Sequence, residues 1–152
     1  PNGEYPELIK EIQMYVPVAN VFSGKAIIGF VREAIQKQIY KAVGRDFYLY
    51  VDANTNNYPS DLIDMIKRAV FNLAFSKYTN TGGVQITNIG IMESSNATQE
   101  PARLERIANL RNDIFETGIR EIDEIIAFIE DQLKITGEAA KYQKYTEVKN
   151  CI

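Results

Sequence analysis

The residues of this sequence that come nearest to a chemical site are carboxylates spaced along one segment: Glu121, Asp123, Glu124, Glu130 and Asp131. A pair of carboxylates can act as general acid and general base, and carboxylates that converge from several helices can bind metal ions. Here they alternate with isoleucines at helical spacing, so we expect them to lie largely on the solvated face of a helix. The segment therefore predicts neither a metal site nor a catalytic pair.

The remaining candidates for catalysis are fewer still. The sequence has no histidine, which removes the imidazole base, the Ser-His and Cys-His pairs and the histidine metal ligand. The single cysteine, Cys151, has no activating partner in the sequence. Gly82 and Gly83 lack the spacing of a phosphate-binding or dinucleotide-binding loop, so we interpret them as turn residues. We predict that the protein is not an enzyme and has no catalytic, cofactor-binding or metal-binding residues.

Composition and charge narrow the class of protein further. The 152 residues are 45% hydrophobic, which is enough for a buried core without disulfide bonds. The formal net charge of −3 provides no global basic excess that would attract nucleic acid or an anionic membrane. No apolar run approaches the roughly 18 residues of a membrane span. We expect a single domain over residues 1–152, with no membrane, sequence-specific nucleic acid or small-molecule substrate among its partners.

Apolar periodicity predicts a mainly α fold, a bundle of about four helices of which one is long. The helical pattern covers residues 24–43, 60–80, 100–133 and 138–149, after a short entry segment at 7–16. At 1.5 Å per residue, the roughly 34 residues of the longest helix would span about 50 Å.

Two features predict how these helices pack. Gly118 lies on the apolar stripe of the long helix, which favours a close crossing by another helix at that point. The aromatic residues 47–50, with Tyr58 nearby, are expected to pack over the end of the bundle rather than to stack on bases, because only Arg45 flanks them with a basic charge.

Residues at about 83–93 break the helical pattern and predict a projecting β-hairpin. Apolar residues alternate with polar ones on both sides of a turn at Asn88 and Gly90. A two-stranded ribbon is marginally stable alone, so the bundle, a longer sheet or a neighbouring subunit must cover its apolar side. The candidate contacts to a subunit or partner are Val84, Ile86, Ile89 and Ile91.

Several short stretches carry a resemblance to a known family: residues 30–34, 40–45, 66–74, 84–91, 110–118, 123–130 and 145–149. In order and spacing they resemble the head-tail connector (adaptor) proteins of tailed phages and prophages of Bacteroides-type bacteria. None of these stretches is a catalytic signature. The resemblance covers most of the chain.

The resemblance implies a virion protein, assembled in the cytoplasm of the bacterial host. It implies a helical bundle with a strand element that forms a homo-oligomeric ring beneath the portal and contacts portal or tail-completion proteins. Because family members often continue past the position of Ile152, we expect this chain to be cut short at its C-terminus. The alternative is a small helical binding or regulatory module. A preformed apolar pocket between helices would favour that module, and flat subunit surfaces would favour the connector.

Overall fold

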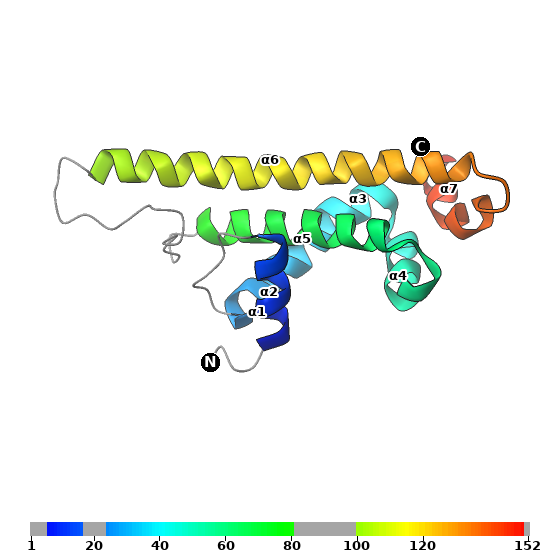
Figure 1. Ribbon diagram of the computed structural model, residues 1–152, viewed down its shortest axis with the longest axis horizontal. Helices are drawn as coiled ribbons and strands as arrows, with labels where there is room; N and C mark the ends of the chain where they lie inside the picture. The colour runs from blue at the N-terminus through cyan, green and yellow to red at the C-terminus, as the bar shows by residue number, and fades with distance from the viewer. Residues whose placement is uncertain (1–5, 17–23, 81–99, 151–152) are drawn as a thin grey trace.

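The computed structural model describes residues 6–16, 24–80 and 100–150, which fold into an elongated arrangement of helices (Figure 1). The α-helices are α1 (Pro6–Tyr15), α2 (Gly24–Ala34), α3 (Tyr40–Val43), α4 (Arg45–Ala53), α5 (Ser60–Asn80), α6 (Glu100–Leu133) and α7 (Gln143–Asn150). A π-helical segment, Ile35–Ile39, joins α2 and α3 into one continuous helix. Short 3-10 turns at Thr55–Asn57 and Ala139–Tyr142 precede α5 and α7.

The prediction of a mainly helical fold is confirmed, and the described ranges contain no strand. The predicted helices at 24–43, 60–80 and 100–133 are present with these bounds. The predicted number of about four helices is wrong for the described residues, because α1 and α4 are helices in addition to the four expected segments. The hairpin expected at about 83–93 lies outside the described residues.

Helix α4 was missed because it is short and follows immediately after a helix stop. Gly44 ends α3 with φ +90°, a conformation that L side chains rarely adopt, and the next residue already belongs to α4. Only Phe47 and Val51 of α4 are buried, one turn apart. A single pair of apolar residues at helical spacing is too weak a periodicity to predict a helix.

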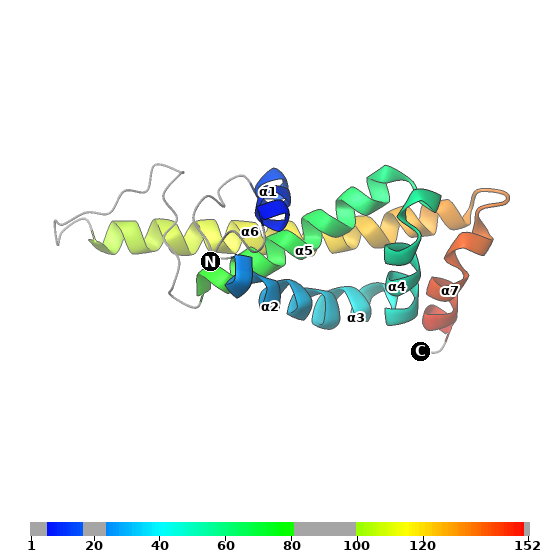
Figure 2. The same cartoon turned by 90° about the horizontal axis from the view of Figure 1, so that it is seen from below.

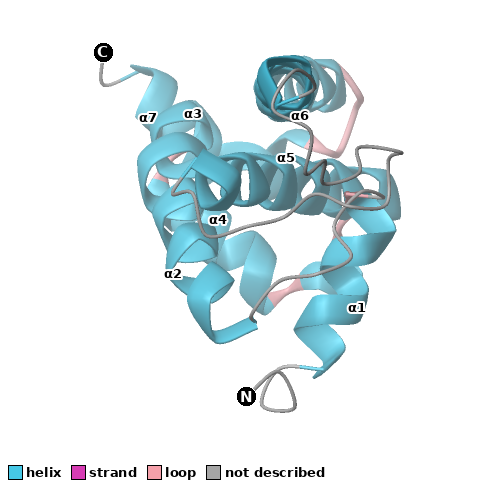
Figure 3. Cartoon of the chain, turned by 90° about the vertical axis from the view of Figure 1, so that its left-hand side faces the viewer, coloured by secondary structure: helices cyan, strands magenta, loops and turns pink. Residues whose placement is uncertain are grey.

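Helix α5 forms the centre of the molecule and runs antiparallel to α6. Every residue from Ala69 to Ser76 is buried, including Asn72 and Ser76. Figure 3 shows the reason: α6 lies on one side of α5, and α1 and α2 lie on the other. The buried polar side chains are satisfied, since the Asn72 amide donates to the carbonyl of Arg68 at 2.7 Å and the Ser76 hydroxyl donates to the carbonyl of Arg111 at 3.3 Å.

The backbones of α5 and α6 approach closely where Gly118 faces Leu73. A Cβ atom added to Gly118 would lie 2.7 Å from Leu73 Cγ and 3.3 Å from the Leu73 backbone nitrogen. The predicted close crossing at Gly118 is therefore confirmed. Beyond it, the first turns of α6 extend past the end of α5 (Figure 1).

Aromatic rings close the opposite end of the α5–α6 pair, where α4 and α7 lie side by side (Figure 2). Phe47 contacts the rings of Tyr58, Tyr142 and Tyr145 with centroids 5.9–6.3 Å apart. The Tyr58 hydroxyl donates to the carbonyl of Lys141 at 2.8 Å, and the Tyr145 hydroxyl donates to Glu130 at 2.8 Å. The expectation that residues 47–50 and Tyr58 pack over the end of the bundle is confirmed for Phe47 and Tyr58, which are buried.

The close crossing predicts opposite effects for two Gly→Ala substitutions. Gly118→Ala should lower the free energy of unfolding by about 1–3 kcal/mol, because its Cβ would press against the Leu73 backbone. Gly29→Ala in α2 has no atom within 4 Å of the added Cβ and should raise the free energy by about 0.5–1 kcal/mol. Urea unfolding followed by circular dichroism measures both. Equal effects of the two substitutions would show that the crossing is not tight.

Candidate functional site

The residues proposed from sequence as partner contacts, Val84, Ile86, Ile89 and Ile91, lie outside the described residues. Of the carboxylates on α6, Asp123, Glu124 and Asp131 are exposed as expected. Glu130 is partly buried and accepts hydrogen bonds from Tyr145 at 2.8 Å and Lys149 at 3.2 Å, which lower its pKa. Glu130 is therefore tied into the contact between α6 and α7.

The expectation of a solvated carboxylate is wrong for Glu121, which is only 8% exposed. Its Oε1 atom accepts from Arg68 of α5 at 3.3 Å, and its Oε2 atom is buried with no hydrogen-bond partner among the described residues. Burial raises the pKa of the Glu121 carboxyl, and the nearby charge of Glu124 raises it further against the opposing effect of Arg68. The sequence held the signal for this placement, since Glu121 follows Ile114 and Gly118 and precedes Ile125 at spacings of three and four residues.

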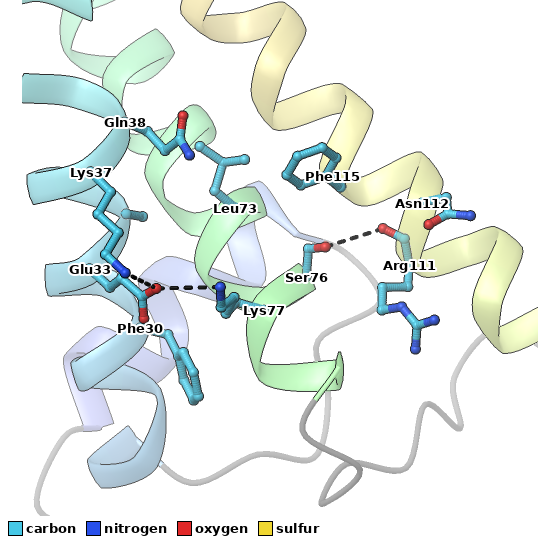
Figure 4. A pocket seen from close by; sticks show the side chains of 11 residues that line it. Phe30, Glu33, Lys37, Gln38, Leu73, Ser76, Lys77, Arg111, Asn112 and Phe115 are labelled. Carbon is cyan, nitrogen blue, oxygen red and sulfur yellow. Dashed lines mark hydrogen bonds and ion pairs between the residues drawn. The ribbon is translucent and has the colours of Figure 1, made fainter. Parts of the chain in front are cut away.

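One charged feature of the described surface is a groove bounded by α2, α5 and α6, with a volume of about 390 Å³ (Figure 4). Its lining comprises Phe30, Glu33, Ala34, Lys37, Gln38, Leu73, Ser76, Lys77, Arg111, Asn112 and Phe115. We call this the basic groove, because three cationic side chains accompany a single carboxylate. Its charged residues come from three separate segments of the chain, so no local pattern in the sequence reveals the groove.

The electrostatics of the basic groove are set by one shared carboxylate. Glu33 Oε1 lies 3.1 Å from Lys37 Nζ and 3.4 Å from Lys77 Nζ, and these contacts lower the pKa of Glu33. In the part of the chain that the structure covers, Arg111 forms no ion pair, so its charge remains available on the α6 wall. Phe115 lies one turn further along α6 and is 45% exposed, so its ring adds apolar surface to the same wall of the groove.

A second groove is apolar and smaller, with a volume of about 230 Å³. Side chains of α1, α2, α4 and α5 line it, among them Leu8, Val31, Ile35, Val51 and Phe71. Its charged residues, Glu11, Asp52 and Lys67, include an ion pair between Lys67 and Glu11 at 3.5 Å. The volume falls below the roughly 300–1,000 Å³ typical of small-molecule sites.

No three His, Cys, Asp or Glu residues in the described ranges are grouped so that they could hold a metal ion. None of the helices observed combines the length and apolar character needed to cross a membrane.

A known protein family matches most of this chain. The model described as "Family of unknown function (DUF6712)" matches residues 32–151, a range that contains α4, α5, α6 and α7 in full and most of the basic groove. Because the match covers well over half of the sequence, the protein belongs to the DUF6712 family. No curated protein and no solved structure matched the chain.

The burial of Glu121 predicts a pH-dependent effect of Glu121→Gln. A raised pKa means that the folded chain holds this proton more tightly than the unfolded chain, so the contribution of Glu121 to stability falls as pH rises from about 4.3 through the raised value. Glutamine cannot ionise, so the stability of the variant relative to the parent should rise as pH increases above about 4 and then stay level once the folded carboxyl is ionised. Urea unfolding from acid to neutral pH measures the difference.

Asp123→Asn is the matched control, because it removes an exposed carboxylate two residues along the same helix. The lowered pKa values of Glu33 and Glu130 affect the pH dependence of stability in the opposite direction. Both residues are present in the parent and in each variant, so their contributions cancel when a variant is compared with the parent. A stability difference for Glu121→Gln that stays constant or falls with pH would contradict the assignment of a raised pKa to Glu121.

Proposed function

We propose that this protein is a head-tail connector (adaptor) subunit of a tailed phage or prophage, which assembles as a ring between the portal and the tail. The proposal rests on the resemblance of residues 30–34, 66–74 and 123–130, among other stretches, to that family. These stretches lie in α2, α5 and α6, and both α2 and α6 pack against α5 at the centre of the fold. This shared packing supports the proposal, because related proteins with a common core would keep it.

The structural observation that supports the proposal is the long α6 helix laid along the shorter α5 helix. Helix α6 has 34 residues and α5 has 21, so α6 is about 20 Å longer at 1.5 Å per residue. The buried centre of α5 ties the two helices together, whereas the first turns of α6 extend past the packed region (Figure 1). A rigid rod with an extended end suits a subunit that contacts neighbours on several sides.

A binding or regulatory module remains the second candidate, because the apolar groove is the kind of pocket that would favour it. An apolar ligand there would contact Val31, Ile35 and Val51 and stabilise the folded chain by mass action. Its small volume weighs against this candidate. The connector proposal instead requires no ligand between the helices.

The genes on either side of this one distinguish the two candidates. For a connector, we expect portal, capsid and tail proteins to be encoded in one co-directional block with it. Sequencing and translating the adjoining DNA tests this expectation. Metabolic or regulatory neighbours without any virion gene would contradict the connector and leave the binding module.

The segment at about 83–93 predicts a variant that assembles poorly although it folds. Ile86→Lys should disrupt ring assembly, because a charge would be buried in an apolar contact between subunits or partners. Electron microscopy of the chain expressed with its portal measures assembly, and thermal unfolding measures folding. Met14→Lys is the matched control, since Met14 is 75% exposed on α1. Normal assembly of Ile86→Lys would show that this segment is not a subunit contact.

A further inference from the structure

The basic groove has the properties of a surface that receives a partner. Arg111 carries a charge without an ion pair among the described residues, while Lys37 and Lys77 share one carboxylate. Phe115 adds apolar surface beside these charges, with its ring on the same wall as Arg111 (Figure 4). Aromatic and arginine side chains are the types that contribute most to protein interfaces.

A surface of opposite charge lies elsewhere on the same chain, along the outer side of α6. It consists of exposed residues at three- and four-residue spacing, Glu116, Arg120, Asp123, Glu124 and Asp131, which we call the acidic face. The core residues Ile122, Ile125 and Ile129 project from the opposite side of the helix, so the acidic face points away from the bundle. Lys134 contacts Asp131 at 3.8 Å near one end, which leaves Asp123 close to the centre of the face.

We infer that the basic groove of one subunit receives the acidic face of α6 from a second copy of this chain. The net charges of the two surfaces are opposite. Each surface also carries one residue of the other sign, which is Glu33 in the groove and Arg120 on the acidic face. Arg120 on the acidic face would lie opposite a groove that contains Glu33, so the mixed charges are complementary in both directions.

The mixed charge of the groove also decides between a second copy and a nucleic acid. A phosphate backbone is uniformly negative, and Glu33 would repel it while holding two of the three cations of the groove. A helix face that carries charges of both signs can pair with Glu33 as well as with Arg111. The second copy is therefore the occupant that the charges favour.

The geometry of this contact is head to tail, because the groove and the acidic face are different surfaces of one chain. Repeated contacts of this kind close into a ring or continue as a filament. In the proposed connector ring, this contact would join one subunit to the next. Its biological meaning therefore rests on the proposed connector function. The contact itself can be tested on the isolated chain without any phage protein.

Sedimentation velocity of the purified chain tests whether the contact exists. We expect concentration-dependent association at low salt that weakens as salt rises, since the screening length falls from about 30 Å at 0.01 M to about 8 Å at 0.15 M. A chain that remains monomeric at millimolar concentration and low salt would overturn the inference. The gene neighbourhood would still test the connector function in that case.

Charge reversal identifies the two surfaces. Arg111→Glu in the groove and Asp123→Arg on the acidic face should each weaken association about tenfold or more, because each puts like charges together. The double variant carrying both changes should recover most of the association, since the pair is then reversed rather than broken. Both side chains are at the surface, so thermal unfolding should change little.

Lys10→Glu is the matched control, because it makes the same change of charge as Arg111→Glu at an exposed site on α1. It should leave association nearly unchanged. An equal loss in Lys10→Glu would indicate an effect of net charge alone and overturn the assignment to the groove. Failure of the double variant to recover, with both single variants weakened, would show that Arg111 and Asp123 do not face each other and would also overturn the inference.

Discussion

The close approach of α5 and α6 at Gly118 is the constraint on which the rest of the structure depends. The absent side chain lets Leu73 of α5 pack directly against the α6 backbone. This contact holds the two longest helices together, and α6 covers one side of the stretch of α5 from Ala69 to Ser76, which is buried throughout. All other described helices are arranged around this pair, with α1 and α2 covering the remaining sides of α5 (Figure 3).

The two ends of the α5–α6 pair differ because different residues are available to fill them. At one end, α4 and α7 supply aromatic rings, and Phe47, Tyr142 and Tyr145 are fully or almost fully buried there. Gly44 lets α7 approach, since a Cβ atom at this position would lie 2.6 Å from Val148. Near the other end, α2 and α6 are separated by the basic groove, which leaves charged and aromatic side chains accessible (Figure 4). The molecule thus has one closed end and an open, charged side.

Charged residues serve two different purposes in this fold. Glu121 is buried beside Arg68 and links α5 to α6, where it retains one oxygen without a hydrogen-bond partner in the described part of the chain. Such a buried carboxylate is weak evidence of stabilisation, because desolvation offsets much of the attraction. Exposed charges instead include two groups of opposite net sign, the basic groove and the acidic face. Their separation along one chain is what a head-to-tail assembly of identical subunits requires.

The sequence by itself determined the helical class, the extents of the three main helices, the close approach at Gly118 and the burial of Phe47 and Tyr58 at the aromatic end. The helices follow from local periodicity, and the close approach follows from a glycine on an apolar stripe. The sequence did not reveal α4, because Phe47 and Val51 provide too short an apolar pattern. Only the tertiary structure decided the basic groove. Glu33, Lys77 and Arg111 are more than 30 residues apart in sequence, and they meet there only because α2 and α6 both pack against α5.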